Sequence, residues 1–143
     1  MHQDTVDHLN RLACKQNIQP QRPWIGVDMD GTLAKWPDNW QVGLGDPVPS
    51  MINRVKAWLG AGECIKIFTS RAWQDNTGYQ RAMIEAWCQE HLGQVLEITC
   101  EKDWWCKEIW DDIGRHVIAN TGIVLHEEQE VQELLNAFAK SGL

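Results

Sequence analysis

The stretch WIGVDMDGT, residues 24–32, decides the fold of this chain. It opens as a short apolar run and turns abruptly to charge at Asp28, which is the pattern of a buried parallel strand that ends at the edge of a sheet. Asp30 follows two residues later, so both carboxylates can face one crevice beyond the strand. Gly31 permits a tight turn of positive φ, in which backbone N–H groups approach an anion. The stretch therefore predicts a strand that delivers two carboxylates and an anion-binding turn to a sheet edge.

Strands and helices alternate along the rest of the chain. Further short strands are expected at 64–69, 95–99, 108–110 and 116–119. Helices are expected at 4–16, at 50–60 with Ser50 as the N-cap, at 75–91 with Gly93 as the stop, and at a closing segment that carries Val131, Leu134, Leu135 and Phe138 and ends at Gly142. This order predicts an α/β, Rossmann-like three-layer fold, in which helices cover both faces of a mainly parallel five-stranded sheet.

Two segments stand outside this core. Residues 1–20 are expected to form an appended N-terminal helix, which Pro20 would end. Residues 33–49 contain several Pro and Gly and are expected to form a loop or small flap. Neither this flap nor the segment between Thr69 and Lys102 can hold a separate domain, because fewer than about 40 residues rarely fold alone. We therefore expect one domain, residues 1–143.

Composition restricts the class of protein. The chain carries 13 Lys and Arg against 20 Asp and Glu, a formal net charge of −7, which disfavours attraction to nucleic acid or to an anionic membrane. No apolar stretch is long enough for a membrane span, and the five Cys lack the spacing of a disulfide framework. We expect a cytoplasmic protein without a membrane partner. Its nine Trp, beside two Phe and one Tyr, exceed what a core requires.

Polar side chains follow each of the first four predicted strands. Beyond Asp28 and Asp30 these are Thr69, Ser70 and Arg71 after the second strand, Lys102 after the third, and Asp111 and Asp112 after the fourth. Ligands of parallel sheets bind at the carboxyl ends of the strands. Hydroxyl and guanidinium groups suit phosphate oxygens, and four converging carboxylates would repel one another without a cation. Mg²⁺ fits this set, because it prefers a few carboxylates, waters and a substrate phosphate.

Each of these groups, taken alone, also has a structural explanation. The stretch from Asp28 to Thr32 could be a turn in which Asp side chains cap the backbone. Thr69 and Ser70 could cap the next helix, and Lys102 could be a solvated surface charge. Their shared position at strand ends in one sheet favours a site over several coincidences.

Four segments in this order resemble the motifs of the haloacid dehalogenase (HAD) superfamily of phosphohydrolases. They are DMDGT (28–32), the Thr of IFTSR, Lys102 in CEKD and the acidic pair of EIWDD, and the resemblance covers about residues 24–122. It implies a HAD-like phosphatase that hydrolyses a phosphate monoester through an aspartyl-phosphate intermediate, with Mg²⁺ as the cofactor. The TSR segment is also similar to the SGR segment of the phosphatase domain in phage polynucleotide kinase.

The resemblance implies catalytic and metal-binding roles for particular residues. Asp28 would be the nucleophile and Asp30 the general acid and base. Thr69 and Lys102 would hold the phosphoryl oxygens. The metal ligands would be Asp28, the carbonyl oxygen of Asp30, and Asp112, with Asp111 as a second ligand or as the holder of a bound water.

Substrate contacts are implied beside these residues, at Gly31, Thr32, Ser70 and Arg71. Arg71 could bind a second anion of the substrate or orient an Asp side chain, and both roles stay open. The lysine of the third motif could be Lys102 or Lys107. We prefer Lys102, because it directly follows a strand end whereas Lys107 is expected to enter the next strand.

Selectivity in this superfamily commonly comes from a cap, and neither insertion point has room for one here. The resemblance therefore implies a capless enzyme with an open site, which would admit a small phosphorylated substrate such as a nucleotide or sugar phosphate, or would be closed by a second subunit of a homo-oligomer. Several Trp fall near the expected mouth: Trp36, Trp40, Trp73, Trp104 and Trp105. They could stack on a base or sugar, and ordinary packing or a dimer patch explains each of them equally well.

Two other functions compete with a phosphatase for small metabolites. A nucleic-acid end-processing enzyme of the 3′-phosphatase type is favoured by the open site and the TSR segment, but the net charge disfavours it. A non-enzymatic phospho-accepting module, or a binding protein, is the third class. A receiver module would place its acceptor Asp after the third strand, an order that this chain does not have.

Overall fold

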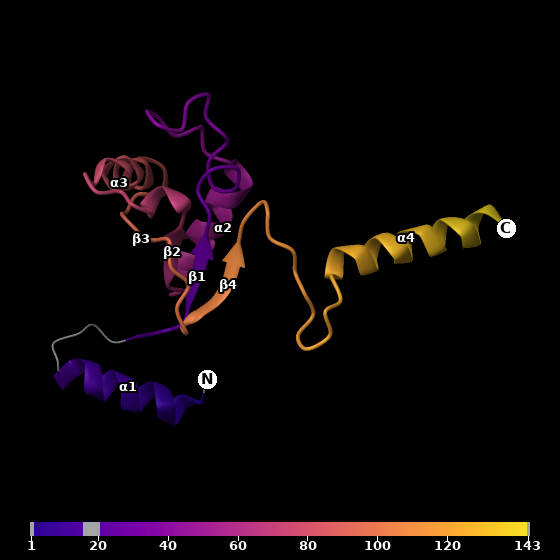
Figure 1. The fold of residues 1–143 in the computed structure, drawn as a ribbon, viewed down its shortest axis with the longest axis horizontal. Coiled ribbons are helices and arrows are strands. Elements are labelled where there is room, and N and C mark those ends of the chain that lie inside the picture. The colour runs from indigo at the N-terminus through magenta and orange to yellow at the C-terminus, as the bar shows by residue number, and fades with distance from the viewer. Residues whose placement is uncertain (1, 16–20, 143) are drawn as a thin grey trace. The chain divides into compact units, whose positions relative to one another are not determined.

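Helices and strands alternate as the sequence predicts as far as the third strand, and the fourth strand follows without a helix between them (Figure 1). The computed structural model describes residues 2–15 and 21–142. Its elements are α1 (Gln3–Lys15), β1 (Trp24–Val27), α2 (Pro49–Gly60), β2 (Ile65–Phe68), the 3₁₀ turn η1 (Ser70–Ala72), α3 (Tyr79–Leu92), β3 (Glu97–Thr99), β4 (Cys106–Trp110) and α4 (Leu125–Ser141). The chain forms two compact units, Met1–Asp112 and Ile113–Leu143.

One sheet organises the first unit. Its four strands are all parallel and lie in the order β3-β2-β1-β4. In the interior strand β1, Val27 pairs with Ile67 of β2 and with Trp110 of β4. The structure thus confirms an α/β fold with a parallel sheet. Because all strands run the same way, the residues that follow them meet at one edge, here called the carboxyl edge.

The predicted fifth strand is wrong. Residues 116–119 contain a single antiparallel bridge, from Val117 to Val124, within the second unit. The Ile118 N–H donates to the Ile123 carbonyl at 2.8 Å, so the backbone of this segment is satisfied in a local hairpin. A short apolar run is compatible with either outcome, because its pattern does not specify which backbone it pairs with.

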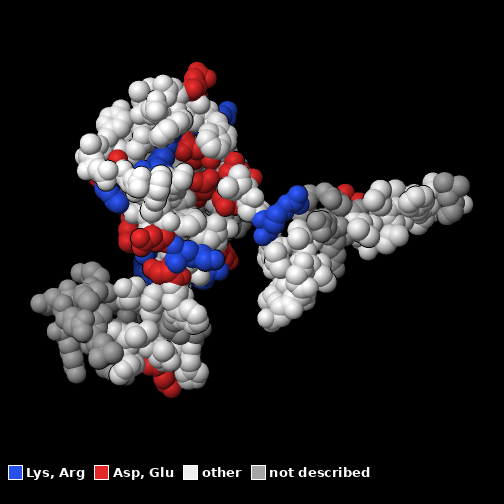
Figure 2. All heavy atoms as spheres, in the orientation of Figure 1, with Lys and Arg blue, Asp and Glu red and all other residues white. Residues whose placement is uncertain are grey.

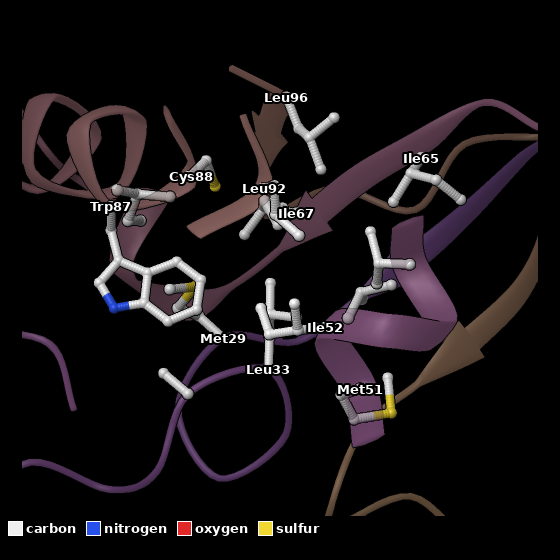
Figure 3. Packing of buried hydrophobic residues seen from close by; sticks show 14 of the residues in the cluster. Met29, Leu33, Met51, Ile52, Ile65, Ile67, Trp87, Cys88, Leu92 and Leu96 are labelled. Atoms are coloured by element: carbon white, nitrogen blue, oxygen red, sulfur yellow. The ribbon is translucent and has the colours of Figure 1, made fainter. Parts of the chain in front are cut away.

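Helices α2 and α3 cover the same face of the sheet and form its core. Figure 3 shows side chains from β2, α2, α3 and the loop after β1 pointing into one cluster. The cluster comprises Ile25, Val27, Met29, Leu33, Ala34, Met51, Ile52, Val55, Ile65, Ile67, Ile84, Trp87, Cys88, Leu92, Leu96 and Ile98. Full burial of one large apolar side chain stabilises a fold by about 1.5–3 kcal/mol. This core therefore holds the sheet and the two helices as one body.

The expectation of helices on both faces of the sheet is wrong for α2 and α3. On the other face Trp24 and Phe68 meet over Gly26, where a Cβ would lie 2.9 Å from the Trp24 ring. The Lys66 ammonium lies 4.8 Å from the centroid of the same ring. A crossover that carries a helix takes about a dozen residues or more, and the connection 100–105 between β3 and β4 is shorter.

Helix α2 begins with a proline rather than with a side-chain cap. Val48 is its N-cap residue, no side chain caps it, and Pro49 stands in the first turn. Proline suits that position, because its missing N–H would have had no partner within the helix. The prediction that Ser50 caps this helix is therefore wrong, while the predicted end at Gly60 is confirmed.

Helix α3 begins four residues later than expected. The carboxylate of Asp75 accepts the N–H of Gln80 at 3.1 Å and that of Arg81 at 2.9 Å, so it satisfies two unpaired donors of the first turn from outside the helix. The predicted stop is confirmed at Gly93, whose φ of 78° closes the helix in the left-handed conformation.

The two terminal helices are confirmed as helices. For α1, Pro20, the residue expected to end the N-terminal helix, lies outside the described residues. Helix α4 ends at Gly142 as predicted. Its apolar residues are 55–61% exposed; they are Val131, Leu134, Leu135 and Phe138. None of the described helices combines the length and the apolar character required to cross a membrane.

Candidate active site

The polar residues that follow β1, β2 and β4 lie at the carboxyl edge. Main-chain pairing continues one residue past the strands: the Asp28 N–H donates to the Trp110 carbonyl at 2.9 Å, and the Thr69 N–H donates to the Thr99 carbonyl at 2.9 Å. Asp112 follows β4 by two residues. Figure 2 shows acidic side chains gathered over the ends of β1 and β4. The edge thus collects carboxylates that are far apart in the sequence.

Asp28 and Asp112 form a close pair of carboxyl groups. They lie within hydrogen-bond reach of each other. Burial raises the pKa of Asp28 from 3.8 to about 7, with the charges of Asp112 and Asp30 adding to the increase and the Met29 N–H opposing it. Two carboxylates in this position cannot both stay charged near neutral pH unless a cation offsets them. The pair therefore has the character of a cation site.

Gly31 lets the loop backbone pass directly against this pair. Its φ is 85°, and a Cβ at this position would collide with Oδ2 of Asp112 and with the indole nitrogen of Trp36. The Trp36 N–H donates to the same Asp112 oxygen at 3.4 Å. The predicted positive-φ turn is present, and its glycine is required both by the backbone conformation and by the closeness of Asp112.

Asp30 is held by a bidentate ion pair with Arg71. The Nε–H of Arg71 donates to one carboxylate oxygen at 2.6 Å, and the Nη2–H donates to the other at 2.8 Å. Asp30 is 8% exposed and Arg71 5%. Such a buried, two-point pair fixes the orientation of a carboxylate. Of the two roles left open for Arg71, this geometry is that of orienting an Asp.

The remaining donors of Arg71 hold the flap. Nη1 donates to the Trp40 carbonyl at 2.5 Å and to the Gln80 side-chain oxygen at 2.7 Å, and Nη2 donates to the Gly43 carbonyl at 3.1 Å. With the two bonds to Asp30 these use all five N–H groups of a guanidinium. Arg71 therefore joins the flap to Asp30 and has no donor left for a substrate anion in this arrangement.

The hydroxyl residues of the site have different surroundings. Thr69 is 3% exposed, and its Oγ1 accepts the Arg71 N–H at 3.2 Å, so it caps the turn η1 and keeps its own proton for donation. Ser70 is exposed. Among the described residues Thr32 Oγ1 is buried and has no hydrogen-bond partner. A buried hydroxyl without a partner costs free energy, so Thr32 is available for a ligand oxygen or a water.

The two candidate lysines lie apart from the paired carboxylates. Lys107 is in β4, as expected, and its ammonium pairs with Glu63 at 2.7 Å. Lys102 is exposed, and its charge acts on Cys106, the first residue of β4. In the part of the chain that the structure describes, Lys102 forms no ion pair with Asp28. Its contact with a phosphoryl group stays a prediction.

The donor set fits Mg²⁺. Over residues 2–15 and 21–142 no cluster of three or more His, Cys, Asp or Glu is placed to hold a metal ion. Mg²⁺ does not need one, since it usually keeps several waters and takes one or two carboxylates together with a substrate phosphate. Asp28 and Asp112 offer two carboxylates, and burial, together with the charges of Asp112 and Asp30, raises the pKa of Asp28. Asp111, the other predicted ligand, is exposed.

A pocket of about 360 Å³ opens beside these groups, lined by Asp30, Trp36, Trp40, Ser70, Arg71 and Trp73. Three of its six lining residues are the tryptophans that the sequence places near the mouth. Trp104 and Trp105 lie elsewhere, at a second pocket with Pro23, Cys106 and Lys107. The sequence therefore identified the aromatic wall of the site but did not separate it from the other Trp pair.

Several contacts of the site carry no signal in the sequence. The carbonyls of Trp40 and Gly43 become acceptors for Arg71 because of the path of the flap, which no residue type specifies. The contact between Gln80 of α3 and Arg71 likewise follows from no residue pattern.

Protein-family models, curated proteins and solved structures were each compared with the chain, and none of them matches it.

Proposed function

We propose that the chain is a capless, HAD-like phosphatase of the cytoplasm that hydrolyses small phosphate monoesters with Mg²⁺. The observation that carries this proposal is the Asp28–Asp112 pair at the carboxyl edge, with the pKa of Asp28 raised to about 7. A carboxylate in that state is a poor nucleophile until a cation offsets its neighbour. Bound Mg²⁺ would supply this positive charge and also attract the substrate phosphate.

The proposed hydrolysis proceeds in two steps, in which Asp28 and Asp30 have different roles. In the first, a carboxylate oxygen of Asp28 attacks phosphorus, the bond to the leaving oxygen breaks with its electron pair, and Asp30 gives that oxygen a proton. In the second, a water oxygen attacks the phosphorus of the aspartyl-phosphate, Asp30 takes the water proton, and the bond from phosphorus to Asp28 breaks. Phosphate is released, and both carboxyl groups return to their starting forms.

The hydrogen bonds of Arg71 to Asp30 and to the flap, here called the Arg71 clamp, affect the first of these steps. Its two donors hold Asp30 as an oriented acceptor, which suits the removal of a proton from water. Donation of a proton to a leaving alkoxide requires Asp30 to gain one first. Esters of acidic alcohols such as p-nitrophenol do not need this donation, so they are the most sensitive substrates for a first assay.

Release of phosphate from p-nitrophenyl phosphate in Mg²⁺ buffer tests the proposal. We expect activity in the unmodified chain, none in Asp28→Asn, and full activity in Asp38→Asn, an exposed flap carboxylate that serves as the control. Activity that survives in Asp28→Asn would show that the nucleophile assignment is wrong. Absence of turnover in the unmodified chain on nucleotides, sugar phosphates and p-nitrophenyl phosphate alike would refute the phosphatase itself.

The end-processing function is the second candidate, supported by the exposure of the pocket wall. The net charge of −7 opposes it, because an acidic protein gains little from contact with a polyphosphate backbone. Comparison of a mononucleotide with a 3′-phosphorylated oligonucleotide separates the two. Turnover confined to the oligonucleotide would select end processing.

A further inference from the structure

The exposed tryptophans of this chain are not scattered. Four of its nine Trp are exposed, and all nine lie in the described part of the chain. Trp36, Trp40 and Trp73 are exposed by 66%, 53% and 67%, and these three line one pocket. Indole rings carry a large apolar area that is favourably removed from water. Three exposed indoles at one pocket therefore indicate a surface that binds a ligand.

One residue of the pocket, Trp36, contacts the paired carboxylates directly. The Trp36 N–H bonds to Asp112 at 3.4 Å, which ties one wall to the proposed metal site. The Trp40 carbonyl accepts from Arg71, whose guanidinium carbon lies 6.0 Å from the Trp40 ring. Trp73 follows η1 directly, so Arg71 and the indole belong to one short segment. A ligand among the indoles would thus lie next to Asp30 and near Asp112, which Trp36 contacts.

The chemistry of the pocket points to a flat, uncharged group. Within the described residues, none of the three indoles stacks on another aromatic ring. Arg71 lies over one face of Trp40, and no other aromatic ring covers the faces of Trp36 and Trp73 in this part of the chain. The charges of Asp30 and Arg71 neutralise each other in an ion pair. The volume of about 360 Å³ falls at the lower end of the range for small-molecule sites, roughly 300–1,000 Å³.

We propose that this pocket binds the base of a nucleoside monophosphate and so selects nucleotides among phosphate esters. The inference deepens the proposed phosphatase and rests on it for the position of the phosphate. Base stacking on the indoles does not depend on turnover. The pocket favours a mononucleotide over a polymer, because it offers aromatic faces and no unpaired positive charge.

Two measurements on the full chain test this assignment. The first compares KM for adenosine 5′-monophosphate with KM for ribose 5-phosphate, which carries a hydroxyl at C1 in place of the base. We expect a KM about tenfold lower for the nucleotide, which corresponds to about 1.4 kcal/mol. The second measures binding of adenosine and of ribose by calorimetry, with no phosphate present, and we expect binding of adenosine alone.

Substitutions at the pocket and outside it separate stacking from general packing. Trp73→Leu is expected to weaken adenosine binding about tenfold and to reduce the ratio of the two KM values by a similar factor. Trp104→Leu is the matched control, because Trp104 is 78% exposed and lies outside this pocket. We expect it to leave both quantities unchanged.

The outcomes distinguish the pocket from the phosphatase. Adenosine binding that depends on Trp73, without phosphate release from any ester, would uphold the pocket and refute the phosphatase. Equal KM values for adenosine monophosphate and ribose 5-phosphate, with no adenosine binding, would overturn the pocket and leave the phosphatase standing. A lower KM for a 3′-phosphorylated oligonucleotide than for the mononucleotide would overturn the inference in favour of end processing.

Discussion

Replacement of Arg71 by Met tests the clamp between the flap and the first-strand loop. The substitution keeps an unbranched side chain of similar reach and removes all five donors at once. Asp30, which is 8% exposed in the unmodified chain, then keeps a negative charge without its arginine partner. The flap loses the two carbonyl contacts, at Trp40 and Gly43, that the guanidinium provides.

The expected loss in the free energy of unfolding is about 3–5 kcal/mol, the usual cost of removing one partner from a buried ion pair. This range applies because the side chains of Arg71 and Asp30 are 2% and 11% exposed, so water screens the pair only weakly. The flap carbonyls add less, since solvent can replace a donor at a partly buried position. The change amounts to a large fraction of the about 5–15 kcal/mol that stabilises a typical domain.

Urea unfolding followed by far-ultraviolet circular dichroism measures this loss. The double variant Arg71→Met with Asp30→Asn separates its causes, because it removes the charge that would otherwise be left alone. We expect the double variant to be more stable than Arg71→Met. Arg22→Met, at an exposed position, is the control and should change stability by less than about 0.5 kcal/mol. A loss below about 1 kcal/mol in Arg71→Met, or no gain in the double variant, would refute the clamp.

Three further predictions concern the turn, the acid pair and the lysine. Gly31→Ala should cost more stability and Mg²⁺ affinity than Gly62→Ala, because only Gly31 lies against Asp112, while the φ values of 85° and 86° cost Ala about 1–2 kcal/mol at both sites. Equal losses for the two variants in urea and Mg²⁺ titrations would contradict this. Without metal, the free energy of unfolding should fall as pH rises from about 4 to about 7, because the folded chain keeps a proton on Asp28 that the unfolded chain has released. Urea midpoints at pH 5 and 8 in EDTA measure this fall. An equal fall in Asp28→Asn would show that Asp28 is not its cause. Lys102→Ala should raise KM for phosphate esters about tenfold or more, while Lys107→Ala should change it little; the reverse result would make Lys107 the phosphate lysine.

The two interior strands of the sheet could be predicted because their apolar residues are buried, in every position of β1 and in alternate positions of β2. β1 ends just before the charged Asp28 and β2 just before the polar Thr69, where each apolar run in the sequence ends. The hairpin at 116–119 could not be distinguished from a strand, because its apolar residues pair locally through Val117 and Val124. Helix starts were predicted less well than helix ends, since Gly93 fixes a backbone conformation whereas Asp75 caps α3 across an intervening turn.

The site was predictable where chemistry follows directly from strand ends. The meeting of Asp28 with Asp112 follows from the pairing of β1 with β4 and from the parallel direction of both strands. The clamp was less accessible, because a Thr-Ser-Arg segment indicates phosphate binding as readily as an ion pair. Only the path of the flap shows that Arg71 donates its hydrogen bonds to Asp30 and to main-chain carbonyls.

The flap is held at its base as well as by Arg71, and this bears on how selectivity can arise without a cap. The Lys35 N–H donates to the Asp46 carbonyl at 2.8 Å, and the Val48 N–H donates to the Leu33 carbonyl at 2.9 Å. From the core, the indole N–H of Trp87 donates to the Gly45 carbonyl at 3.0 Å. A loop fixed at these points presents its exposed indoles from a set position. Selectivity would then come from the side chains that the flap carries rather than from closure of a second domain, and substitutions at Trp36 and Trp40 should alter substrate preference without a change of fold.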